Sequence, residues 1–170
     1  DLFQGAGVAK FVFEELGVTK AAAIHDGDPY TEGLARVFAD AFEELGGTIV
    51  AFEAVNKGDT DMTPVLTEVA GFGPEAIYFP IFQPEGDFIV QQVGGISGLE
   101  DVTLIGADGL AISDFYTLPE TTGMYFSGPD LNFGENVSST GVNAADFLSR
   151  YEESFGEQPS AAFWAHSYDA

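Results

Sequence analysis

Two aspartates separated by a single residue follow a short apolar segment. Asp26 and Asp28 follow Ala21–Ile24, and a helical pattern begins a few residues later. Carboxylates in such a position can act as a nucleophile and as an acid/base beside it, with Mg²⁺ as the electrophile. The chemistry that this pair suggests is phosphoryl transfer from a phosphate ester.

Phosphatases of the haloacid-dehalogenase type open with an aspartate pair of this spacing, but they need further groups. A cation must lie near the phosphoryl group, and a second acidic cluster must hold the metal. The cations after the pair are Arg36, Lys57 and Arg150, which fall in a helix, in a loop after an edge-like strand and on a solvated helix face. Since a two-residue spacing is also a weak signal, the phosphatase is kept as an alternative only.

Other patterns of enzyme and cofactor sites are missing from the sequence. It contains neither Gly-x-Gly-x-x-Gly nor Gly-x-x-x-x-Gly-Lys, and no Gly-x-Ser-x-Gly carries a serine nucleophile. A receiver-type phosphoacceptor would need a lysine at a later strand end. The chain has no cysteine, and its two histidines, His25 and His166, lie far apart in sequence. We therefore predict no catalytic residue, no disulfide, no metal site and no cofactor.

Three more residues with useful side chains follow apolar segments. Tyr30 stands just before a helix start, and Phe82 lies in a loop that Pro80 and Pro84 restrain. Each aromatic either packs on the rim of a sheet or covers a ligand in a cleft. Asp108 ends an apolar segment, where a carboxylate either caps the next turn or holds a cation. The three residues are candidate walls of one ligand site.

Strands and helices that would position these residues alternate along the chain. Short apolar segments predict strands over 21–24, 48–55, 76–82, 102–105 and 123–127. Apolar residues at helical spacing predict helices over 7–16, 34–45, 62–69, 84–93, 113–118 (capped by Ser113), 142–155 and from 160 onward. A polar loop is expected over 128–141.

This alternation predicts a three-layer, Rossmann-like α/β sandwich. Its central sheet would hold about five mainly parallel strands, with right-handed crossovers and helices on both faces. The carboxyl ends of parallel strands share one edge of the sheet, where ligands bind in such folds. Tyr30, Phe82 and Asp108 should therefore lie along the same edge.

Composition restricts the class of partner. The 170 residues include 28 acidic and 5 basic ones, a formal net charge of -23. Nucleic acid and anionic membrane surfaces need Lys and Arg, so neither is an expected partner. No apolar run approaches the roughly 18–20 residues of a spanning helix. The acidity fits a solvated surface, adaptation to high salt or, as a lesser alternative, recognition of a cationic ligand.

Several segments together resemble a known family. The chain is similar to the type I periplasmic ligand-binding proteins, and among these to the branched-chain amino-acid (Leu/Ile/Val) receptors of ABC transporters. The likeness covers nearly the whole chain, in order and at compatible spacing. It is carried by His25–Gly33, Gly58–Asp61, Gly73–Ala76, Phe82–Glu85, Ile105–Gly109, Gly156–Ser160 and Tyr168–Ala170.

The resemblance implies a role for each candidate residue. Members of the family clamp a ligand between two Rossmann-like lobes, and residues 1–170 correspond to the second lobe of such a protein. By position in the motifs, Tyr30 would lie over the ligand side chain, Phe82 would be a cleft aromatic, and Asp108 would hold the α-ammonium of an amino acid. Some relatives have Tyr where this chain has Phe82, so a hydrogen bond made there is lost. The α-carboxylate would be held mostly by the other lobe.

The function that the resemblance implies is solute capture, not catalysis. We expect a segment of a longer periplasmic or extracellular protein, with lipid anchoring through a preceding segment as one form of attachment. It would bind a small amino-acid-like ligand for import, with an ABC-transporter permease as partner and without membrane insertion of this segment. The alternatives are a sensory receptor domain of the same fold that binds amides or other small solutes, and the Mg²⁺-dependent phosphatase.

Overall fold

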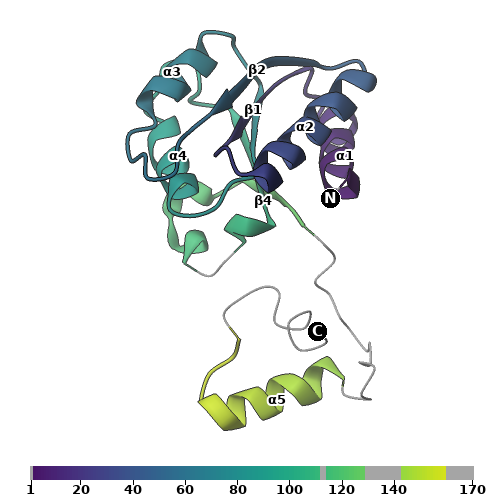
Figure 1. Ribbon diagram of the computed structural model, residues 1–170, viewed down its shortest axis with the longest axis vertical. Coiled ribbons are helices and arrows are strands. Elements are labelled where there is room, and N and C mark those ends of the chain that lie inside the picture. Colours follow the sequence, from purple (N-terminus) through teal and green to yellow (C-terminus); the bar gives the residue numbers. More distant parts are fainter. Residues whose placement is uncertain (1, 112–113, 129–142, 160–170) are drawn as a thin grey trace. The chain divides into compact units, whose positions relative to one another are not determined.

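The computed structural model describes residues 2–111, 114–128 and 143–159. The chain divides into two compact units, Asp1–Ser127 and Gly128–Ala170 (Figure 1). The first unit contains the sheet. The second contains one described helix, α5 (Ala144–Phe155), whose first backbone N–H groups are capped by Asn143 and which ends at Gly156 in the left-handed conformation. This helix confirms the one predicted over 142–155.

A five-stranded parallel sheet forms the centre of the first unit. Its strands stand in the order β2-β1-β3-β4-β5, so the chain reverses its direction across the sheet after β2. In open α/β sheets the loops diverge at such a switch point and leave a crevice at the strand ends. The strands are β1 (Lys20–His25), β2 (Thr48–Ala54), β3 (Ala76–Phe79), β4 (Thr103–Ala107) and β5 (Tyr125–Ser127).

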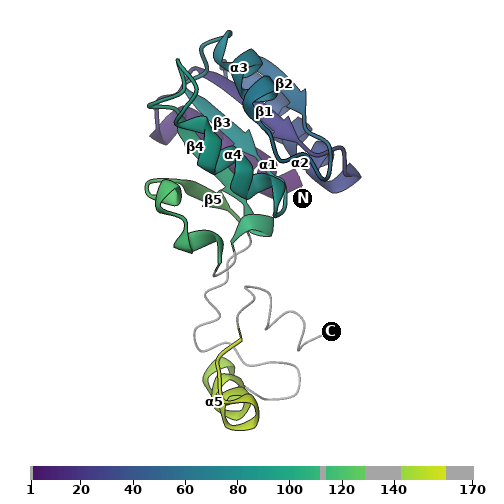
Figure 2. The ribbon, with the colours of Figure 1, turned by 90° about the vertical axis from the view of Figure 1, so that its left-hand side faces the viewer.

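Helices cover both faces of this sheet, which confirms the three-layer α/β prediction (Figures 1 and 2). Alternate residues of each central strand enter opposite cores: Ile77 packs on one face and Tyr78 on the other. This is the period of two that a strand covered on both sides requires. One face carries α1 (Leu2–Lys10), its π-helical continuation η1 (Phe11–Glu15) and α2 (Pro29–Glu44); the other carries α3 (Thr63–Ala70) and α4 (Glu85–Val93).

Local signals explain where α2 begins and ends. The Asp28 side chain accepts a hydrogen bond from the backbone N–H of Tyr30 at 2.9 Å, and Pro29 occupies the first turn, where its missing N–H costs nothing. Gly47 follows the helix. A Cβ there would lie 2.3 Å from the ring of Phe42, so only glycine lets the returning chain pass this closely.

Some predicted boundaries were wrong for identifiable reasons. The first helix starts at Leu2 rather than at residue 7. The strand predicted over 76–82 ends at Phe79, because Pro80 has no N–H to donate to the ladder. The strand predicted to end at residue 105 continues to Ala107, since Gly106 and Ala107 still pair with β5.

The predicted helix over 113–118 is a single 3-10 turn, η3 (Phe115–Thr117). Two similar turns, η2 (Asp108–Leu110) and η4 (Pro119–Thr121), flank it, so this segment is a series of turns rather than an α-helix. Ser113, most of the loop predicted over 128–141 and the helix predicted from residue 160 lie outside the described residues. None of the described helices has both the length and the apolarity needed to cross a bilayer.

Candidate ligand-binding site

Tyr30, Phe82 and Asp108 lie together at the carboxyl ends of the strands. The Tyr30 hydroxyl donates to Asp108 Oδ1 at 3.2 Å. The rings of Tyr30 and Phe82 are 6.1 Å apart between centroids and tilted by 32°. Phe82 keeps 39 % of its surface exposed although it packs on its neighbours. The predicted shared edge is therefore observed, while the role of the three residues in ligand binding stays a prediction.

Gly109 makes the close approach of Phe82 possible. A Cβ on this residue would lie 2.7 Å from two carbons of the Phe82 ring. Phe82 follows β3 and Gly109 follows β4, so the absence of a side chain in one loop lets the aromatic of the next loop lie across it. The arrangement places a partly exposed apolar ring against Gly109, the residue that follows Asp108.

Two residues that sequence reasoning missed also belong to the site. Gln4, on α1, donates from Nε2 to Asp108 Oδ1 at 2.6 Å and to the backbone oxygen of Ser127 at 3.1 Å. The Ser127 hydroxyl lies 3.2 Å from the hydroxyl of Tyr78. Gln4 and Asp108 are 104 residues apart in the chain, so no local pattern could have connected them.

The electrostatics of the site keep Tyr30 in its neutral form. Burial, followed by the negative charge of Asp108 and the hydrogen bond to it, raises the pKa of Tyr30 to about 12. Burial also raises the pKa of Tyr78. Both phenols therefore remain protonated at neutral pH, and the Tyr30 hydroxyl can donate to the Asp108 carboxylate.

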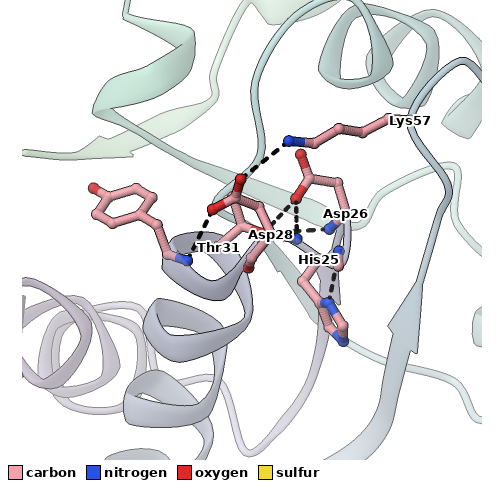
Figure 3. Close-up of polar contacts among 7 residues, drawn as sticks. His25, Asp26, Asp28, Thr31 and Lys57 are labelled. Carbon is pink, nitrogen blue, oxygen red and sulfur yellow. Dashed lines mark hydrogen bonds and ion pairs between the residues drawn. The ribbon is translucent and has the colours of Figure 1, made fainter.

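Asp26 and Asp28 shape the loop that leads into α2 (Figure 3). Asp26 Oδ1 accepts from the backbone N–H of Asp28 at 3.0 Å and from the hydroxyl of Thr31, while Asp28 caps the helix. Asp26 Oδ2 is buried and has no hydrogen-bond partner among the described residues. The pair is thus engaged in a turn and a cap rather than held open toward a substrate.

Lys57 is the cation beside this pair. Its Nζ lies 3.1 Å from Asp28 Oδ2, and this contact raises the pKa of the lysine (Figure 3). The backbone N–H of Tyr30 and then Lys57 lower the pKa of Asp28. Sequence reasoning placed Lys57 only in a loop and missed this ion pair. Across the described ranges, no three His, Asp or Glu side chains come together as a metal site.

Comparison with known proteins defines the class. The model of the periplasmic binding protein family matches residues 3–170, and the chain belongs to this family. The resemblance inferred from the sequence motifs is therefore confirmed.

Individual relatives are binding proteins for branched-chain amino acids. The chain is 30% identical over 118 residues to Leu/Ile/Val-binding protein homolog 3 of Brucella melitensis, a match that covers 69% of this chain and 32% of the relative. It is 27% identical over 167 residues to Leu/Ile/Val-binding protein homolog 1 of Brucella suis, covering 98% of this chain and 43% of the relative. The chain thus spans less than half the length of these curated relatives.

Solved structures of binding proteins for branched-chain amino acids are similar to this chain as well. The chain is similar to the substrate-binding protein LivJ of the branched-chain amino acid transporter of Streptococcus pneumoniae, in complex with isoleucine, with 30% identity, a TM-score of 0.72 and coverage of 99% of this chain and 47% of that one. It is also similar to the leucine-binding protein LivK of Thermotoga maritima, with 29% identity and a TM-score of 0.72. That match covers 95% of this chain and 45% of LivK. These matches support a solute-binding role and do not favour the phosphatase alternative.

Proposed function

We propose that this chain is the second lobe of a two-lobe solute-binding protein that captures an amino-acid-like ligand for an ABC transporter. The observation that supports it most directly is the contact of Tyr30 with both Asp108 and Phe82. The first turn of α2 and the segments that follow β3 and β4 thereby present one carboxylate and two aromatic rings at a single edge of the sheet. Its relatives include proteins for branched-chain amino acids.

The chemistry of the three side chains suits one end of an amino acid. The Asp108 carboxylate pairs with the α-ammonium group, and a hydrogen bond between charged partners is among the stronger ones. Tyr30 and the exposed ring of Phe82 supply apolar area for an aliphatic side chain. No hydroxyl is available at Phe82, so it contributes contact area and no hydrogen bond.

The α-carboxylate of the ligand needs a cation or N–H donors, and no unpaired cation lies beside Asp108 among the described residues. Lys57, which lies between β2 and α3, is already paired with Asp28. We therefore assign the α-carboxylate to the first lobe, outside residues 1–170. That the chain spans less than half of its relatives supports this division. The whole protein would act in the periplasm or outside the cell, lipid-anchored or free, without cofactor or catalysis, and would deliver its ligand to a permease.

A ligand screen on the full-length protein tests this function. Thermal shifts are measured with each standard amino acid, and hits are titrated by calorimetry in the parent and in Asp108→Asn. A stabilising amino acid whose binding weakens in the variant supports the proposal. Turnover of p-nitrophenyl phosphate, with no shift by any amino acid, would favour the phosphatase instead. A transmembrane helix and kinase domain in the full-length protein would indicate the sensor.

A further inference from the structure

The amide nitrogen of Gln4 makes three polar contacts at the carboxyl-end edge of the sheet. One Nε2 nitrogen contacts Asp108 Oδ1 at 2.6 Å, the Ser127 backbone oxygen at 3.1 Å and the Ser127 hydroxyl at 3.2 Å. An ionised carboxylate and a carbonyl can only accept hydrogen bonds, so the amide must present its NH₂ group to them. Its two hydrogens thus bridge the ends of β4 and β5.

Ser127 provides a fixed support for this bridge. It pairs with Ala107 in the sheet, and its hydroxyl lies 3.2 Å from that of Tyr78. Tyr78 is a fully buried residue of β3. Gln4 therefore links Asp108, through Ser127, to Tyr78 in the core of the sheet.

Both hydrogen bonds that the Asp108 side chain receives within the described part of the chain go to the same oxygen. Gln4 and Tyr30 donate to Oδ1, at 2.6 Å and 3.2 Å, from helices α1 and α2. Two donors on one oxygen fix the rotation of the carboxylate. Among the described residues, no donor contacts Oδ2, so this oxygen can accept from a further donor.

We propose that Gln4 is the positioning residue of the Asp108 anchor: by holding Oδ1 against Ser127 it directs Oδ2 to the ammonium group of the ligand. This inference rests on the proposed function. Gln4 acts through Asp108 and need not touch the ligand. Its contribution is to selectivity for ligands that carry an amino group, because a carboxylate free to rotate aligns less well with a single donor group.

The ligand test uses leucine and 4-methylpentanoate, which differ by the amino group, and the full-length protein. Gln4→Met keeps the length of the side chain and removes the donor. We expect the affinity ratio between the two probes to fall about tenfold, as for the loss of alignment of one charge-assisted bond. The matched control is Gln92→Met, because the Gln92 amide also hydrogen-bonds residues distant in sequence, the backbone groups of Met62 and Thr60, away from the site. An unchanged ratio in Gln4→Met, or an equal fall in Gln92→Met, overturns the proposal.

A second test needs no ligand and uses this chain itself. Gln4→Glu places a carboxyl group within hydrogen-bond distance of Asp108 Oδ1, where two like charges must share a proton. Carbon-13 NMR of the side-chain carboxyls should show one of them releasing its proton only above about pH 6. In Gln4→Glu/Asp108→Asn this late titration should vanish. Titration of both residue 4 and Asp108 at an ordinary pH in the single variant would overturn the placement of Gln4.

The two tests separate the inference from the function on which it rests. A late titration together with a parent protein that does not bind leucine leaves Gln4 beside Asp108 and removes leucine as the ligand. An ordinary titration together with tight leucine binding leaves the function intact and removes Gln4 as the positioning residue.

Discussion

The phenol of Tyr30 donates a hydrogen bond to Asp108 at 3.2 Å, across 78 residues of sequence. This contact joins the first turn of α2, which follows β1, to the 3-10 turn η2 after β4, although β3 stands between these two strands. It is therefore a contact along the edge of the sheet, and it passes beside Phe82 from the intervening loop. A ligand at this edge would meet all three residues.

Asp108→Asn in the full-length protein should weaken amino-acid binding about tenfold to a hundredfold. The asparagine keeps the size of the side chain but loses the charge, and bonds to charged groups are worth about 1.5–3 kcal/mol. Calorimetry measures the effect. Asp101→Asn, an exposed position before the opposite end of β4, is the control and should leave the affinity unchanged. Unchanged binding in Asp108→Asn would reduce Asp108 to a turn residue and remove the amino-acid assignment.

Two substitutions at Tyr30 separate its ring from its hydroxyl. Tyr30→Phe should weaken binding about twofold to tenfold, since one hydrogen bond to Asp108 is lost. Tyr30→Ala also removes apolar contact and should cost about as much as Asp108→Asn. Titrations with the same amino acid compare the two. Tyr125→Phe, where the ring packs on Phe11, is the matched control. Equal affinities for the parent and Tyr30→Ala would place the ligand elsewhere.

The stability of the chain should depend on Tyr30 at alkaline pH. The folded-state pKa of Tyr30 is raised to about 12, against about 10 for an unfolded tyrosine. A raised pKa contributes stability that is complete below the unfolded value, so this contribution should be lost as the pH rises from about 10 to 12. Urea denaturation at a series of pH values tests this. Tyr30→Phe should show a shallower decline than the parent; identical curves would contradict the buried contact with Asp108.

Gly109→Ala should displace the Phe82 ring. The new Cβ would lie 2.7 Å from that ring, which is partly exposed and can move outward. Losing a packed aromatic pair costs about 0.5–1.5 kcal/mol, so ligand affinity should fall about twofold to tenfold. Gly33→Ala serves as the control, because no neighbouring atom lies within 4 Å of its Cβ position on α2. If both variants bind equally well, Phe82 does not line the site.

Salt should stabilise the fold. A net charge of -23 on 170 residues implies mutual repulsion that screening relieves. The melting temperature should rise with KCl by more than that of a near-neutral domain of similar size. A flat response up to about 1 M, where the screening length is about 3 Å, would contradict adaptation to high salt.

Local sequence patterns determined the layers of this protein. Short apolar runs make up β1, β3 and β4, because a strand covered on both faces buries nearly every residue. The apolar stripe of α2 recurs at helical spacing, because a helix buries one face. Alternation of the two kinds of element then requires a parallel sheet. Since parallel strands end at one edge, the shared location of Tyr30, Phe82 and Asp108 followed from the sequence as well.

The tertiary structure alone decided which side chains meet at that edge. The position of β3 between β1 and β4 sets the distance from Tyr30 to Asp108, and no residue of either segment encodes that order locally. The packing of α1 against α2 brings Gln4 to the carboxylate, and the return of the chain after β2 brings Lys57 to Asp28. These contacts join residues far apart in the sequence, and the packing of the core decides which of them come together. The spacing of apolar residues predicts which face of an element is buried, but it does not predict which residue of another element that face will contact.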